Sequence, residues 1–87
     1  MSAEHVELDR IVLALDNALG EAQTFAQGSH DDFHELVRHC REMYDILLAV
    51  LVRHPELATT EMRSYVDATR ATIHELELLA GTPTARH

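Results

Sequence analysis

Histidine is the residue type in this chain with the clearest capacity for chemistry, because seven histidines occur among 87 residues. His30 and His34 are four residues apart, so on a helix both imidazoles project from the same side and could share one metal ion. Two ligands do not complete a tetrahedral zinc site, and no third ligand stands at the spacing of a known zinc motif. A metal-binding or metal-responsive protein using His30 and His34, with His39 as a third candidate ligand, is therefore the alternative function. We expect no resident metal and no cofactor.

Nucleophilic catalysis is the other chemistry that the sequence raises, because His39 and Cys40 are neighbours. Adjacent side chains on a helix point about 100° apart, so these two residues do not form a nucleophile–base pair. The sequence also contains no glycine-rich phosphate loop, no Ser, His and Asp in the order and spacing of a hydrolase triad, and no paired inward-facing carboxylates. We therefore predict that the protein is not an enzyme.

Charge and composition restrict the partners and the compartment. Seven arginines and no lysine stand against fifteen carboxylates, giving a formal net charge of −8. Nucleic acids and anionic membranes require clustered positive charge, so we expect neither as a partner. One cysteine suits a reducing compartment, and the longest apolar run, residues 46–52, is too short to span a bilayer. We expect a cytoplasmic protein, and the all-arginine basic complement indicates a bacterial source.

Three helices must position these side chains, because apolar residues recur at three- and four-residue steps in three segments. We predict helices over about residues 3–27, 30–53 and 60–80 in one domain spanning 1–81, followed by a flexible tail over 82–87. The fold class is all-α: an antiparallel three-helix bundle, or a helical hairpin with a third helix, that dimerises. The residues that indicate helix ends are Ser2, Gly28, Ser29, Pro55, Thr59 or Thr60, Gly81 and Pro83.

One apolar stripe on each helix forms the predicted core. The members of these stripes are Leu8, Ile11, Val12, Leu15, Ala18, Leu19, Ala22, Phe25 and Ala26, then Phe33, Leu36, Val37, Cys40, Tyr44, Leu47, Leu48 and Leu51, and finally Met62, Tyr65, Val66, Thr69, Ile73, Leu76 and Ala80. Ala14, Ala18, Ala22 and Ala26 also recur every four residues, which permits close approach of another backbone.

Further apolar residues exceed what one core face requires. Met43, Ile46 and Val50 form a second stripe on the 30–53 helix, beside the first. Three arrangements would cover it: a central position of this helix between the other two, a second copy of the chain, or a helix of another protein. The residues that we predict to contact a partner are Met43, Ile46, Val50 and Leu13, with Val6 and Leu78 in a secondary role.

Two family resemblances concern the second and third helices. The short turn Gln27–Phe33, followed by a long apolar helix and a last helix ending in Ile73-His74-Glu75-Leu76-Glu77-Leu78-Leu79, resembles the small flagellar export chaperones of the FliT type. The segment from Met62 to His74 resembles the last helix of TraM-type quorum-sensing anti-activators. The chain departs from both families in length and in its first helix, so no binding residue is carried over.

The residues and the resemblances lead to the same functional class. Both families imply a protein that sequesters another protein through apolar helix faces, the client being an export substrate or a transcriptional regulator. We predict a non-catalytic protein-binding module of this class, a chaperone, adaptor or anti-activator, which is itself a homodimer. Apolar anchors would supply affinity, and the acidic flanks would set register and partner choice.

Overall fold

The computed structural model is helical throughout the residues that it describes, which are 3–26 and 30–81. It contains α1 (Ala3–Phe25), α2 (His30–Arg53), a short 3₁₀ helix η1 (Pro55–Leu57) and α3 (Thr60–Leu79). The prediction of three helices and no strand is confirmed for this part of the chain. Each helix end lies within two residues of the end expected from the sequence.

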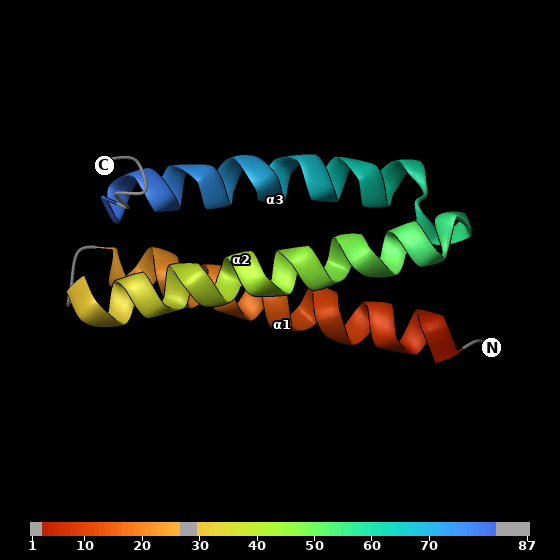
Figure 1. The fold of residues 1–87 in the computed structure, drawn as a ribbon, viewed down its shortest axis with the longest axis horizontal. Helices are drawn as coiled ribbons and strands as arrows, with labels where there is room; N and C mark the ends of the chain where they lie inside the picture. The colour runs from red at the N-terminus through yellow and green to blue at the C-terminus, as the bar shows by residue number, and fades with distance from the viewer. Residues whose placement is uncertain (1–2, 27–29, 82–87) are drawn as a thin grey trace.

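The three helices lie side by side, and the chain reverses direction between consecutive helices (Figure 1). α1 and α2 pack against each other along most of their length, whereas α3 packs mainly on α2 and touches α1 much less. The resulting molecule is elongated, with extents of 42 × 23 × 17 Å. Two of the helices therefore form a tight hairpin, and the third covers one side of it.

Local chemistry explains where α2 ends and where α3 begins and ends. α2 ends at Arg53, two residues before Pro55, because proline disfavours the α conformation in the residue before it. The Thr59 hydroxyl accepts a hydrogen bond from the Met62 backbone N–H at 3.1 Å and caps α3. Gly81 follows α3 with a φ of +66°, the left-handed conformation that favours glycine after a helix. The expectations for Ser2, Gly28, Ser29, Pro83 and the 82–87 tail lie outside the described residues.

The core is built from the predicted stripes of all three helices. Its buried side chains are Leu8, Ile11, Leu15, Ala18 and Ala22 on α1, Phe33, Val37, Cys40, Tyr44, Leu47 and Val50 on α2, and Ile73 and Leu76 on α3, with Leu57 from η1. Val50 and Leu57 were not expected in the core. The η1 turn, held by hydrogen bonds from Leu57 N–H to His54 O and from Ala58 N–H to Pro55 O, places Leu57 there.

Candidate interaction surface

Two polar contacts show which side of the α1–α2 hairpin α3 occupies. On α2, the Arg41 guanidinium donates from Nε and Nη2 to the two carboxylate oxygens of Glu77, each at 3.1 Å. On α1, Asp16 Oδ1 accepts a hydrogen bond from the Tyr65 hydroxyl at 2.8 Å. The pKa of Tyr65 is raised above its usual range, first by burial and then by this carboxylate. Arg41 and Asp16 therefore mark the α3-facing side of the hairpin.

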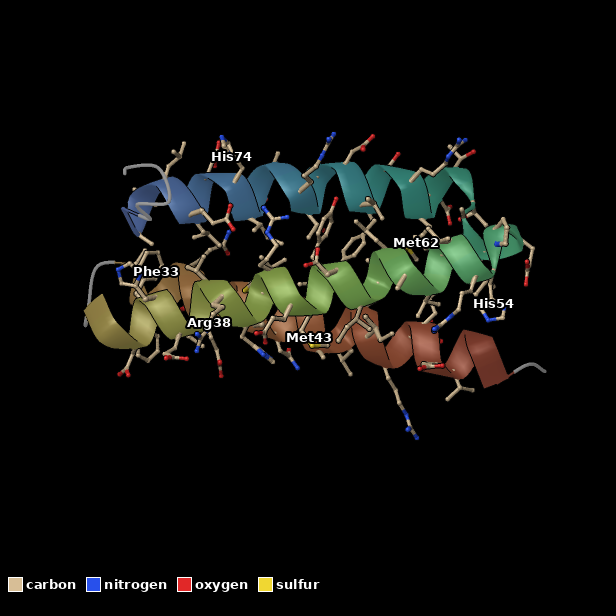
Figure 2. All side chains as sticks on the ribbon, viewed as in Figure 1. Phe33, Arg38, Met43, His54, Met62 and His74 are labelled. Carbon is tan, nitrogen blue, oxygen red and sulfur yellow. The ribbon has the colours of Figure 1, made fainter. Side chains whose placement is uncertain are left out.

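The opposite side of α2 carries Met43 and Ile46. At 100° per residue, Met43 lies about 160° around the helix from Arg41, and Ile46 lies about 140° from it. Figure 2 shows Met43 on the side of α2 turned away from α3. Ile46 is 47% exposed, and Met43 is partly buried against the core. This part of α2 is not covered by α3, and exposed His39 lies on it between the two apolar residues, about 20° around the helix from Ile46.

The opposite side of α1 carries apolar residues among the exposed charged residues Glu7 and Glu21. Ala14 lies about 160° around α1 from Asp16, and Phe25 lies about 180° from it. Phe25 is 38% exposed, although the sequence placed it in the core stripe, and Ala14 is partly exposed. Both residues therefore belong to the side of the hairpin that α3 leaves uncovered.

A shallow hollow joins these two helix edges at the end of the hairpin where α1 leads into α2. Its volume is about 250 Å³, and it is lined by Glu21 and Phe25 from α1 and by Asp32, Glu35 and Leu36 from α2. Because one hollow is lined from both helices, their exposed edges meet at this end of the hairpin. We call the side of the hairpin that α3 leaves uncovered the open face; its apolar members are Ala14, Phe25, Leu36, Met43 and Ile46.

Val50 requires a correction of the predicted contact set. It was expected to contact a partner, but it is 2% exposed and belongs to the core of its own chain. Val50 lies about 40° around α2 from Ile46, which brings it closer to the buried stripe. Of the second stripe of α2, Ile46 and Met43 reach the surface and Val50 does not.

The other three predicted contact residues lie on different surfaces. Leu13 is two residues from both Ile11 and Leu15, so it points almost directly away from the core of α1. Val6 is seven residues before Leu13 and shares that outer side. Leu78 is exposed on the outer side of α3, two residues from buried Leu76. The structure therefore does not bring the six predicted residues together: two are on the open face, one is in the core, and three are elsewhere.

Sequence reasoning missed three members of the open face. Phe25 and Leu36 had been assigned to the core stripes, and Ala14 to a ridge of small residues. Phe25 and Leu36 are exposed because they lie near the end of the hairpin, where no further helix turn covers the core stripe, whereas Ala14 lies at the middle of α1 on the side that α3 leaves uncovered. Val52 and Leu79 are also strongly exposed apolar residues. Val52 lies about 120° around α2 from Ile46 and is not part of the open face.

The candidate chemical residues are not gathered into a site among the described residues. His34 and His39 are exposed on α2, whereas the side chain of His30 lies outside the described part of the structure. Within the described residues, no group of three or more His, Cys, Asp or Glu side chains is placed to hold a metal ion. Cys40 is fully buried, and burial raises the pKa of its thiol to about 11. A protonated, inaccessible thiol is a poor nucleophile.

None of the helices in the described ranges combines the length and apolar character needed to cross a membrane. Comparison of the chain with protein-family models, with curated proteins and with solved structures gave no match.

Proposed function

We propose that the antiparallel three-helix unit is a non-catalytic protein-binding module whose open face covers an apolar helix of a client protein. The observation that supports this is the one-sided coverage of the hairpin: α3 is bound to one side through Arg41 and Asp16, and the apolar surface around Ile46 remains in water. Fully burying a large apolar side chain contributes about 1.5–3 kcal/mol. Ile46 is 47% exposed and Phe25 is 38% exposed, so covering them contributes a fraction of that amount for each and favours association.

The recognition that fits this surface is the docking of an amphipathic helix along the hairpin. Ile46, Met43 and Phe25 would anchor the apolar side of the client helix, and small Ala14 permits its close approach. The exposed carboxylates of Glu21, Asp32 and Glu35 line the hollow at one end of the open face. These carboxylates favour a client helix that carries basic residues beside its apolar stripe.

Other properties support this class. The resemblances to FliT-type export chaperones and TraM-type anti-activators point to a client that is an export substrate or a transcriptional regulator. The lone buried cysteine suits work in the reducing cytoplasm. No observation favours the metal-binding alternative, because His34 is exposed and no third ligand is placed beside it among the described residues.

A matched pair of substitutions on α2 tests the proposal. Ile46→Asp places a charge on the open face, and Val52→Asp places the same charge on an exposed apolar residue, 78% accessible, outside that face. Tagged wild-type and variant proteins are used to capture clients from a lysate, and the captured proteins are quantified by mass spectrometry. We expect the wild-type client to be retained by Val52→Asp and lost with Ile46→Asp, while far-UV circular dichroism remains unchanged in both. Equal capture by both variants would overturn the proposal.

A further inference from the structure

The end of the open face near the hollow is acidic. Glu21 on α1, together with Asp32 and Glu35 on α2, lines this hollow, and all three carboxylates are exposed. Glu35 is paired with Arg38 at 2.7 Å on the surface of α2. Glu21 and Asp32 form no ion pair with another side chain in the described part of the chain. This end of the face therefore presents carboxylates to whatever covers it.

The opposite end of the open face carries arginines. Arg10 lies one helical turn before Ala14 on α1, about 40° around the helix, and Arg53 lies about 20° around α2 from Ile46. Both arginines are exposed. Glu7 stands one turn before Arg10, so the α1 and α2 residues at this end of the face carry two guanidinium groups against one carboxylate. Exposed Glu56 of η1 lies beyond Arg53 and contacts His54 at 3.6 Å. The two ends of the open face thus differ in the sign of their charge.

We propose that a second copy of this chain covers the open face in the resting protein, with its helices antiparallel to those of the first copy. In a twofold dimer, residue i of one copy contacts residue j of the other, and residue j contacts residue i. An axis running across the helices places Arg10 opposite the second copy's Glu21 and Arg53 opposite its Asp32. An axis along the helices would instead place carboxylate against carboxylate and arginine against arginine.

The spacing of the charges allows one axis to satisfy both pairs. The midpoint between Arg10 and Glu21 falls between residues 15 and 16 of α1, and the midpoint between Asp32 and Arg53 falls between residues 42 and 43 of α2. Because Glu21 and Phe25 share a hollow with Leu36 and Asp32, the α1 midpoint is level with residues 41–42 of α2. The two midpoints therefore differ by only about one residue, roughly 1.5 Å along the hairpin.

The size of the open face fits a reversible dimer. From Asp32 to Arg53 the helix rises about 30 Å, and two packed helices are about 20 Å wide, so two copies would together bury on the order of 1,200 Å². This area is at the lower end for specific protein–protein interfaces, the range of transient complexes. The inference rests on the proposed function in that the same face binds the client, so a client helix would displace the second copy.

A charge exchange within α1 tests the pairing. Arg10→Glu, Glu21→Arg and the double variant are compared with the wild type by analytical ultracentrifugation at low ionic strength. Both sites are exposed and lie inside the helix rather than at its ends. Arg63→Glu on α3 changes the net charge as Arg10→Glu does, but it is remote from the open face and serves as the control.

We expect the wild type to dimerise, each single variant to weaken the dimer about tenfold, and the double variant to recover most of that loss. Arg63→Glu should leave the dimer constant nearly unchanged. A wild type that stays monomeric at high concentration, or a double variant no tighter than the single variants, overturns the inference. Either result leaves the proposed function standing, because client capture by the Ile46→Asp and Val52→Asp pair is measured separately.

Discussion

Two neighbouring positions on α2 should respond very differently to the same charge. Val50 and Ile46 are one helical turn apart in the same stripe, but Val50 is 2% exposed and Ile46 is 47% exposed. Replacing each with aspartate removes an aliphatic side chain and introduces a carboxylate. We expect Val50→Asp to unfold most of the protein and Ile46→Asp to leave it folded.

The magnitudes follow from burial. Val50→Asp forfeits about 1.5–3 kcal/mol of apolar burial, and raising the pKa of a buried carboxyl by about three units costs roughly 4 kcal/mol more. The sum is comparable to the total stability of about 4–13 kcal/mol expected for a chain of this length. Ile46→Asp loses only part of its burial and keeps its carboxylate in water, so its cost stays below about 1.5 kcal/mol.

Urea denaturation followed by far-UV circular dichroism at one protein concentration measures the difference. Val50→Ala, with an expected loss of about 1–2.5 kcal/mol, provides a folded intermediate case. A Val50→Asp protein as stable as the wild type would refute the burial of Val50. An Ile46→Asp protein that loses its helicity would show that Ile46 belongs to the core and that the open face is wrongly placed.

Three other predictions concern single contacts. Thr59→Ala should cost about 1 kcal/mol in urea denaturation through loss of the cap on the Met62 N–H, whereas Thr59→Ser should retain most of it. Because the pKa of Cys40 is raised by burial to about 11, its contribution to stability is full below the unfolded value near 9 and is lost as pH rises towards 11. Stability measured from pH 8 to 11 should therefore fall less steeply in Cys40→Ala, and equal slopes would contradict the burial. Since burial and Asp16 hold the pKa of Tyr65 above its usual range, ultraviolet titration should show Tyr65 ionising at lower pH in Asp16→Asn than in the wild type; an unchanged midpoint would remove Asp16 as a cause.

The helices and most of the core could be predicted from the sequence because they depend on periodicity alone. Every buried α1 residue, from Leu8 to Ala22, lies in the predicted stripe. Pro55 and Thr59 likewise predict, from local chemistry alone, where α2 ends and where α3 begins. The burial of Leu57 could not be predicted, because it depends on how η1 packs against the helices. An element of three residues is too short to show a periodic apolar pattern.

The interaction surface was only partly predictable, because it depends on which sides of the hairpin α3 covers. Helical spacing gives the direction of a side chain but not how far the neighbouring helix extends over it. The sequence therefore could not show that Val50 is buried and Ile46 is exposed. Leu13 and Leu78 illustrate a second limit. A single apolar residue on an outer side has the same sequence signature as one that belongs to a continuous surface, and only the arrangement of helices distinguishes them.

Amide chemical shifts, recorded by NMR over a range of protein concentrations, test the role of the open face without any substitution. We predict concentration-dependent shifts concentrated around Ala14, Met43 and Ile46, with the outer side of α3 around Leu78 unaffected. Shifts centred on Leu78 instead, or spectra that do not change up to the highest soluble concentration, would contradict the coverage of the open face by a second copy.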